Sequence, residues 1–357
     1  MKVLVIQQKM IGDVLTSSIL CENIKNKMPN SEVHYVVNTH TLAVVNNNPY
    51  IDKLVIFKEE YRKSKFKFYT FLKEMKKENY DVVIDVYAKL ESNLITFFAK
   101  APITISNTKW YSKFIYNHSY KNIKSGDSVL GLAIENRLKL LEPILPNAEN
   151  LITKPAIYLT TDEISDAKSF LEDHDIDLCQ PILMINVLGS DKTKTYPLSY
   201  MAEVLDYITE YTGAVLLFNY APNQVKEAKE LYHLCKEKTR EHIKFDVYAS
   251  SLRSFLSILH HCQALIGNEG GGVNMAKALD KPTFSIFSPW ITKEAWNLYK
   301  DNANVAIHLK DYFPEKINNK SQKEIRKEYE IQYQNLKPVL FKEKLKNFLS
   351  LEVISNQ

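Results

Sequence analysis

The sequence has few of the features that mark disulfide-bonded, zinc-binding, nucleic-acid-binding or membrane-spanning proteins. Its four cysteines are scattered and form no CxxC pair, so neither a disulfide framework nor a zinc site is indicated, and a reducing compartment is expected. A net charge of +4 over 357 residues does not fit a strongly basic nucleic-acid binder. No apolar run approaches the ~20 residues that span a bilayer, and the start of the sequence shows no basic n-region followed by an apolar h-region, so no secretory leader is expected. We therefore expect a cytoplasmic protein.

The first half of the chain alternates short β-branched runs with helical stretches. Strands are expected at residues 3–6, 33–37, 54–57 and 81–85, and helices at 14–28, 41–47, 66–78, 90–99 and 127–142. The strands are apolar at consecutive positions, which is typical of a parallel sheet covered by helices on both faces. The fold class is therefore predicted to be α/β.

A second alternating series follows a break rich in proline and asparagine at residues 143–155. It begins with a helix at 161–173, which the Thr160-x-x-Glu163 spacing of a capping box opens. The remaining elements are strands at 182–188, 214–218, 243–247, 264–266 and 283–287, and a closing helix at 338–350 with proline in its first turn. Two doubly wound halves in tandem make a cleft between them the expected ligand site. We place the domains at 1–158 and 159–330, followed by a C-terminal helical segment at 331–357.

The first informative loop follows the first strand and contains Gly12 and Asp13. A carboxylate at the start of a helix is favoured in its ionised form by the helix dipole, and there it can accept a proton from a hydroxyl. Aspartate is also among the best helix caps, so a purely structural role for Asp13 is the alternative.

The second informative loop, residues 189–197, is rich in small, hydroxylated and basic residues. Ser190, Lys192 and Lys194 suit phosphate oxygens, because the loop leaves backbone N–H groups open and adds positive charge. Lysines beside a surface turn are the alternative. The loop lacks the Gly-Lys-Ser/Thr order of a P-loop, so nucleotide hydrolysis of that type is not supported.

The third informative loop holds four of the nine glycines of the chain, at positions 267 and 270–272. A strand, a glycine-rich turn and a helix N-terminus together form an anion site suited to a diphosphate, and Glu269 would reach sugar hydroxyls from the same loop. A tight strand-to-helix connection with only structural glycines is the alternative. The dinucleotide pattern GxGxxG does not occur.

These three loops, in this order, resemble glycosyltransferase family 9, the heptosyltransferases of bacterial lipopolysaccharide core assembly. Gly12-Asp13 is similar to the family's opening motif, whose aspartate is the proposed base. The segment 194–197, Lys-Thr-Tyr-Pro, resembles a Lys-x-Trp-Pro element in which the lysine faces the donor phosphates. The segment 268–279, with Lys281-Pro282 and 287–289 behind it, resembles the family's Asn-Asp-Ser-Gly stretch.

The resemblance covers most of residues 1–290. It implies two Rossmann-like domains of the GT-B type, with the acceptor side first and the nucleotide-sugar side second. The implied donor-binding residues are Gly12, Ser190, Lys192, Lys194, Gln224, Asn268, Glu269, Gly270, Gly271, Gly272 and Asn274.

The sequence departs from the family pattern at four of these positions. Glu269, Gly270 and Asn274 stand where the family carries Asp, Ser and His, and Gln224 stands where a glutamate is often found. A longer acid, a lost hydroxyl and a lost imidazole would change contacts with both sugar and phosphate.

The resemblance implies an inverting glycosyl transfer with the nucleotide-sugar as substrate and no cofactor. Asp13 would deprotonate an acceptor hydroxyl as it attacks the anomeric carbon. The sequence shows no cluster of His, Cys and Asp with metal-ligand spacing. The leaving charge is therefore expected to be held without a metal, by Lys194, backbone N–H groups at 270–272 and the helix dipole.

Acceptor-side candidates come from a basic segment and from a later loop. Residues 58–78 hold eight basic and four acidic side chains interleaved with aromatics. Such a segment suits a phosphorylated or lipid-linked glycan and a peripheral contact with the inner face of the membrane, and a solvated lysine-rich face is the alternative. The candidates are Arg62, Lys63, Lys65, Lys109 and Trp110, although Trp110 fits the protein core equally well.

Two other functions remain open on the sequence. A nucleotide-sugar epimerase could share this architecture, but the acid and base groups that it needs around the sugar ring cannot be located. The departures at 269, 270 and 274 also leave room for a non-catalytic protein that binds a sugar nucleotide or a glycan.

Overall fold

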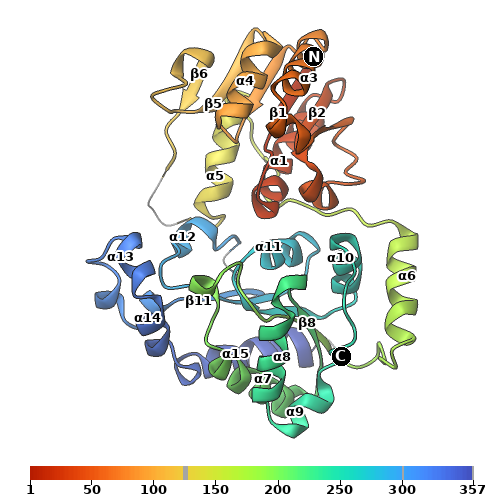
Figure 1. Ribbon diagram of the computed structural model, residues 1–357, viewed down its shortest axis with the longest axis vertical. Helices are drawn as coiled ribbons and strands as arrows, with labels where there is room; N and C mark the ends of the chain where they lie inside the picture. Colours follow the sequence, from red (N-terminus) through yellow and green to blue (C-terminus); the bar gives the residue numbers. More distant parts are fainter. Residues whose placement is uncertain (124–127, 300, 356–357) are drawn as a thin grey trace. The chain divides into compact units, whose positions relative to one another are not determined.

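The computed structural model describes residues 1–123, 128–299 and 301–355, and the chain divides into two compact units (Figure 1). The first unit comprises Met1–Tyr158 together with the short segment Glu294–Leu298. The second unit comprises Leu159–Lys293 and Tyr299–Gln357. The sequence pattern did not predict that residues 294–298 belong to the first unit.

The first unit is built on a six-stranded parallel sheet. Its strands are β1 (Lys2–Ile6), β2 (Glu32–Asn38), β3 (Lys53–Phe57), β4 (Val82–Asp85), β5 (Ile103–Asn107) and β6 (His118–Tyr120). Its helices are α1 (Ile11–Lys27), α2 (Glu60–Lys63), α3 (Lys65–Lys77), α4 (Leu90–Ala99) and α5 (Leu132–Leu138). The strand order β3-β2-β1-β4-β5-β6 reverses its direction beside β1, so the carboxyl ends of β1 and β4 flank the switch point at which ligands of such sheets bind.

The sheet of the first unit is buried on both faces, as the consecutive apolar residues of its strands predict. All four residues at 3–6 of β1 are fully buried. One face packs in a core where Leu4 and Ile6 meet Phe71 of α3 and Ile95 of α4. The strands and helices expected at 3–6, 33–37, 54–57, 81–85, 14–28, 66–78 and 90–99 are confirmed within a few residues.

Two expected helices of the first unit differ from the structure. The stretch at 41–47 is a 3-10 helix, Thr39–Val44, and Asn47 then turns the backbone into the left-handed region at φ 60°. The helix expected at 127–142 begins only at Leu132, and residue 127 lies outside the described residues. Gly131 at the N-cap position has φ 91°, which is not helical, and a Cβ atom there would lie 2.7 Å from the side chain of Leu298.

The second unit is built on a five-stranded parallel sheet of order β11-β10-β9-β7-β8. Its strands are β7 (Ile182–Asn186), β8 (Val215–Asn219), β9 (Ala264–Asn268), β10 (Thr283–Ile286) and β11 (Asn304–Ile307). The helices around it are α6 (Thr161–Glu172), α7 (Leu198–Thr212), α8 (Val225–Leu234), α9 (Glu237–His242), α10 (Leu252–His260), α11 (Gly271–Ala278), α13 (Gln322–Lys327), α14 (Tyr329–Asn335) and α15 (Lys342–Leu349). The short α12 (Lys293–Trp296) lies where the chain passes between the units. The switch point of this sheet lies between β7 and β9.

The capping box at the start of α6 is confirmed, because Thr160 accepts from the N–H of Glu163 while Glu163 accepts from the N–H of Thr160. The strand expected at 243–247 is wrong. Only Ile243 bridges to Leu216, and a turn closed by the N–H of Val247 on the carbonyl of Lys244 follows directly.

The C-terminal segment packs on the second unit. Pro338 opens a 3-10 helix, Pro338–Leu340, rather than the closing α-helix, which is α15. Phe341, Leu345 and Phe348 are buried in the core that includes Phe284 of β10. All four cysteines are free, and three of them are buried. Of the helices that the structure describes, none is long and apolar enough to cross a bilayer.

Candidate functional site

Asp13 lies in the first turn of α1. This helix follows β1 after the short loop 7–10 (Figure 1). The residue at the N-cap position is Met10, whose φ is 59°, and no side chain caps this helix. Asp13 is therefore not the helix cap, although its charge is still favoured by the helix dipole.

The carboxylate of Asp13 forms an ion pair with Arg137 of α5. The Oδ1 atom of Asp13 lies 2.7 Å from the Nη2 atom of Arg137. The side chain of Asp13 is 27% exposed and that of Arg137 only 8%, so the carboxylate remains accessible while its partner is buried. An accessible carboxylate with a fixed cationic neighbour can accept a proton from a bound hydroxyl.

Arg137 is held from three sides, and it is a site residue that the sequence reasoning missed. Its Nε atom donates to Ser17 Oγ at 2.8 Å, and its Nη1 atom donates to the carbonyl of Ala133 at 2.7 Å. Arg137 is one of five arginines in a chain that otherwise uses lysine. An arginine on the buried side of an amphipathic helix is the one signal that could have pointed to it.

A buried carboxyl, Asp85, holds the loop at the carboxyl end of the neighbouring strand β4. It accepts from the N–H of Ala88 at 2.8 Å and from the hydroxyl of Tyr116 at 2.6 Å. Complete burial raises the pKa of Asp85 to about 6, and the two hydrogen bonds oppose that rise. The N–H of Tyr87 donates to the carbonyl of Ile6, so this loop lies beside the end of β1.

In the second unit, three asparagines join the carboxyl ends of β7, β8 and β9. Asn186 donates to the carbonyl of Asn268 at 2.6 Å, and Asn219 donates to the side chain of Asn186 at 2.8 Å. Asn268 accepts from the N–H of Tyr196 at 2.7 Å and is fully buried. Asn268, predicted as donor-binding, thus holds the loop 189–197 against the glycine-rich turn. Asn186 and Asn219 were not predicted.

Lys194 and Glu269, predicted from different loops, lie together. The Nζ atom of Lys194 is 3.3 Å from the Oε1 atom of Glu269, whose side chain is 9% exposed. Burial raises the pKa of Glu269, and the nearby Lys194 ammonium opposes the rise. The pair brings a cation and a hydrogen-bonding acid to the switch point of the second sheet.

Trp290 and Arg326 complete the surroundings of Lys194, and neither was predicted. The Nζ atom of Lys194 lies 5.5 Å from the centre of the Trp290 ring, and the Arg326 guanidinium lies 4.7 Å from it. The indole N–H donates to the carbonyl of Thr193 at 3.0 Å. Trp290 therefore orders the Lys194 loop as well as two cationic side chains.

The glycine-rich turn leads directly into α11. Gly270 is at the N-cap position with φ 153°, and a Cβ atom built on it would meet nothing within 4 Å. Gly271 and Gly272 form the first turn of the helix, and Asn274 follows on its half-buried side. The first N–H groups of a helix have no carbonyl partner within it, so this turn offers free donors and the positive end of the dipole.

The remaining donor candidates line a pocket of about 350 Å³ at the loop after β7. Ser190, Lys192 and Gln224 contribute to its wall, together with Glu227 of α8, which was not predicted. The amide of Gln224 donates to the carbonyl of Gly189 at 2.8 Å, so this side chain also shapes the loop. Gly12, the last residue of the predicted donor set, belongs to the first unit, in the first turn of α1.

The acceptor candidates of the first unit differ in how accessible they are. Arg62 is engaged by two acids, since its Nε atom lies 3.1 Å from Glu91 and its Nη1 atom 3.0 Å from Glu59. Lys63 and Lys65 are exposed. Lys109 donates to the carbonyl of Ala88.

Trp110 is 90% exposed, so the alternative that places it in the core is wrong. The Trp110 and Tyr111 rings meet edge to face, with their centroids 5.7 Å apart. An indole exposed to this extent contributes little to the core, so it is available to a ligand or a surface.

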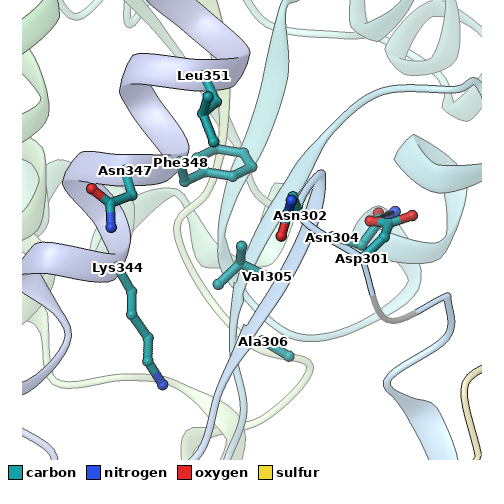
Figure 2. Close-up of a pocket in the computed structure, with 9 residues that line it drawn as sticks. All are labelled: Asp301, Asn302, Asn304, Val305, Ala306, Lys344, Asn347, Phe348 and Leu351. Carbon is teal, nitrogen blue, oxygen red and sulfur yellow. Dashed lines mark hydrogen bonds between the residues drawn. The ribbon is translucent and has the colours of Figure 1, made fainter.

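A further pocket, of about 470 Å³, lies between β11 and α15 (Figure 2). Asn304, Val305 and Ala306 of the edge strand line one side, and Lys344 and Phe348 are among the residues of the other. None of the predicted site residues is in its wall. Because ligands of doubly wound sheets bind at the carboxyl ends near the switch point, this edge pocket is not the expected site.

Comparison with family models and curated proteins identifies the family of this chain. The family model of glycosyltransferase family 9 (heptosyltransferase) matches residues 68–326. Lipopolysaccharide heptosyltransferase 1 of Campylobacter coli is 23% identical over 319 residues, which is 86% of this chain and 89% of that protein.

Solved structures that share the fold include a family 9 glycosyltransferase and a heptosyltransferase. A family 9 glycosyltransferase from Veillonella parvula superposes with a TM-score of 0.72 at 16% identity, covering 93% of this chain and 97% of that one. The E. coli heptosyltransferase WaaC with ADP superposes with a TM-score of 0.68 at 16% identity, covering 93% of this chain and 100% of that one.

Proposed function

The chain belongs to glycosyltransferase family 9, and on that basis we propose that it transfers a heptose or a related sugar from a nucleotide-sugar to a lipopolysaccharide core or a similar glycan. Its similarity to a curated heptosyltransferase supports the sugar and the acceptor class. The ADP held by the similar E. coli enzyme supports an adenine nucleotide as the leaving group. Since the family is one of glycosyltransferases, it favours sugar transfer over the epimerase and the non-catalytic binding protein.

The observation that carries the proposed mechanism is the accessible carboxylate of Asp13, fixed by Arg137 at the carboxyl end of β1. In the proposed reaction Asp13 accepts the proton of an acceptor hydroxyl while the hydroxyl oxygen bonds to the anomeric carbon. The bond from that carbon to the diphosphate oxygen breaks, and its electron pair leaves with the nucleoside diphosphate. Attack opposite the leaving group inverts the anomeric configuration.

We propose that the leaving diphosphate is neutralised without a metal ion. Lys194 would supply a cation, and the N–H groups of the turn at 270–272 together with the dipole of α11 would supply hydrogen bonds and partial positive charge. Glu269 would accept hydrogen bonds from sugar hydroxyls beside that cation. Ser190, Lys192, Gln224 and Glu227, around the 350 Å³ pocket, would hold the rest of the nucleotide.

For the acceptor we propose a phosphorylated, lipid-linked glycan reached from the inner face of the membrane. Lys63, Lys65, Lys109 and Trp110 are the side chains that would contact it. Arg62 is already paired with Glu59 and Glu91, so its contribution would be to hold the segment rather than to bind phosphate.

The test combines ligand binding with turnover by the full-length protein. ADP-, GDP- and UDP-sugars are screened for thermal stabilisation, and one of them is expected to raise the Tm because it binds only the folded state. That donor is then incubated with a heptose-deficient lipopolysaccharide acceptor, in chelator, and release of the nucleoside diphosphate is measured. Asp13→Asn is expected to slow release about 10²- to 10⁴-fold and to keep the thermal shift.

The matched control is Asp162→Asn, which changes an exposed acid in the first turn of α6. It is expected to turn over at the wild-type rate. Unchanged release by Asp13→Asn would remove Asp13 as the base, and loss of activity in chelator would contradict the metal-free mechanism. An epimer formed without acceptor would replace the transferase by the epimerase.

A further inference from the structure

The strongly exposed aromatic side chains of the described residues all belong to the first unit. They are Phe66, Tyr69, Phe97, Trp110, Tyr111 and Phe114. Trp110, Phe114 and Phe66 are 90%, 82% and 78% exposed. Isolated apolar side chains are common on protein surfaces, whereas a set confined to residues 66–114 marks a contact surface.

Helix α4 has an apolar outward side. Leu90 and Phe97 are two turns apart and therefore lie on the same side of the helix, where they are 71% and 57% exposed. The opposite side, with Ile95 and Ala99, is buried in the core. A helix at a protein surface normally places polar residues outward, so α4 departs from the expected pattern.

The exposed residues of α3 and of the 113–115 segment flank this side of α4. The ring of Tyr69 in α3 contacts Phe98 of α4 edge to face at 6.1 Å, and α3 packs along α4 (Figure 1). On the other flank, the hydroxyl oxygen of Tyr116 lies 2.7 Å from the side-chain amide of Asn93 in α4, and the 3-10 helix Lys113–Ile115 contacts α4. Helices α3 and α4 and the 3-10 helix thus lie side by side, and the Nζ atom of Lys109 donates to the carbonyl of Ala88, which brings the loop before the 3-10 helix to the start of α4. Their exposed apolar residues are here called the aromatic face: Phe66 and Tyr69 of α3, Leu90 and Phe97 of α4, and Trp110 and Phe114.

Lysines outnumber acids on α3, and Glu91, next to Leu90 on α4, is paired with Arg62. Helix α3 carries five lysines and one acid, Glu74, in its thirteen residues. Lys73 lies with its Nζ atom 4.6 Å from the ring of Tyr69, and Lys109 and Lys113 accompany Trp110 and Phe114. Aromatic side chains that sit at the depth of lipid headgroups, ringed by lysines that attract anionic lipid, are the pattern of an interfacial membrane contact.

A second copy of the chain fits this surface less well. A two-fold interface places the same patch on both sides, so the lysines of α3 would face each other and repel. Anionic lipid instead offers the opposite charge across the whole surface.

We propose that the aromatic face docks this protein on an anionic lipid bilayer. Phe66, Phe97, Trp110 and Phe114 enter the headgroup region, and the lysines of α3 and of the 109–113 loop contact lipid phosphates. This inference deepens the proposed function, since a lipid-linked acceptor is presented at such a surface. It assigns the membrane contact to residues on α4 and the 110–114 loop that the basic segment 58–78 does not include.

The experiment measures flotation of the full-length protein with vesicles of phosphatidylcholine alone or with about a third phosphatidylglycerol. Binding to the anionic vesicles is expected, weakening at high salt because lysine–phosphate attraction is screened. Phe66→Ser/Phe97→Ser is expected to lower the vesicle-bound to free ratio about tenfold or more, since two exposed rings no longer leave water. The fluorescence of Trp110 is expected to shift to the blue on binding, and Trp110→Phe removes that shift.

The matched control is Ile331→Ser/Val339→Ser, which removes two apolar side chains, 60% and 72% exposed, from the second unit. It is expected to bind vesicles as the wild type does. Equal loss of binding in this control, equal binding to uncharged vesicles, or a dimer that Phe66→Ser/Phe97→Ser dissociates would each overturn the proposal.

The same variants separate this inference from the proposed function. Turnover of a soluble, delipidated acceptor is expected to stay at the wild-type level in Phe66→Ser/Phe97→Ser. If the wild type transfers sugar normally but does not bind vesicles, the docking surface is refuted and the proposed function stands. Vesicle binding without any sugar transfer would refute the proposed function alone.

Discussion

The guanidinium of Arg137 reaches Asp13 from a helix that lies 124 residues further along the chain, and the two side chains meet at 2.7 Å. Helices α1 and α5 pack against each other and so bring the pair together (Figure 1). The arginine is anchored on Ser17 and on the carbonyl of Ala133, so it is a rigid support for the carboxylate. The base that we propose is thus positioned by a residue that need not touch the substrate.

Arg137→Met is expected to slow sugar transfer about ten- to a hundredfold, because the carboxylate of Asp13 loses its fixed orientation. In the Asp13→Asn background the same substitution is expected to have little further effect, since the two residues act through one contact. Steady-state rates of the four proteins of this cycle give the coupling. The control is Arg253→Met, which breaks an arginine–glutamate pair with Glu163 in the second unit and should leave the rate unchanged. Independent, additive effects of the two changes would contradict a positioning role.

Lys194→Gln is expected to weaken binding of the nucleoside diphosphate about ten- to a hundredfold, the range for one lost charge-assisted hydrogen bond. Glu269→Gln should keep or strengthen that binding, because Lys194 is then no longer shared with a carboxylate. The nucleotide-sugar should nevertheless bind Glu269→Gln more weakly than the wild type does. Calorimetric titration of both ligands tests this, with Lys226→Gln on α8 as the control. Equal losses for both ligands in Glu269→Gln would contradict its assignment to the sugar.

The pH dependence of stability should carry a contribution from Asp85. Its pKa in the folded state is about 6, above the value of the unfolded chain, so the folded state holds the proton more tightly. By linkage, the contribution of Asp85 to the free energy of unfolding is largest below about pH 4. About 2–3 kcal/mol of that contribution is lost as the pH rises from about 4 to 6. Urea unfolding of the wild type and of Asp85→Asn across that range measures it. As the pH rises from about 4 to 6, the free energy of unfolding of the wild type should fall relative to that of Asp85→Asn. A difference between the two proteins that stays constant over this range would contradict the raised pKa of Asp85.

Two glycine-to-alanine changes should differ sharply in cost. At Gly267, φ is 135° and an added Cβ atom would run into the carbonyl of Asn186 in the neighbouring strand, so Gly267→Ala should lose about 2–4 kcal/mol. At Gly213, which ends α7 with φ 65°, nothing lies within 4 Å of the added atom, and about 1 kcal/mol is expected. Chemical denaturation of both variants measures the order. A larger loss for Gly213→Ala would contradict the close approach of β7 and β9.

Much of the fold follows from local pattern. The apolar runs that form β1, β2, β7 and β9 need a sheet buried on both faces, and a parallel sheet with crossing helices satisfies that need. Prediction failed at two places where the backbone departs from the local pattern. Ile243–Val247 alternates apolar and charged residues like a strand, yet only Ile243 pairs. Helix α5 starts late because Gly131 before it has a non-helical backbone with φ 91°, and this glycine lies against Leu298, a residue from a distant part of the chain.

The residues of the candidate site also fall into those that the sequence predicts and those that it does not. The positions of Asp13, Lys194 and the glycines at 270–272 follow from the sequence, because each lies in the loop that ends a recognisable strand and strand ends set the place of such loops. The partners of these residues do not follow from it. Arg137 beside Asp13, Glu269 beside Lys194 and Trp290 beneath Lys194 are joined by the packing of helices and strands remote in sequence, and no local pattern encodes such distances. The sequence alone therefore determines which chemical groups lie in the strand-end loops. The tertiary structure decides which neighbours orient these groups and set their electrostatic surroundings.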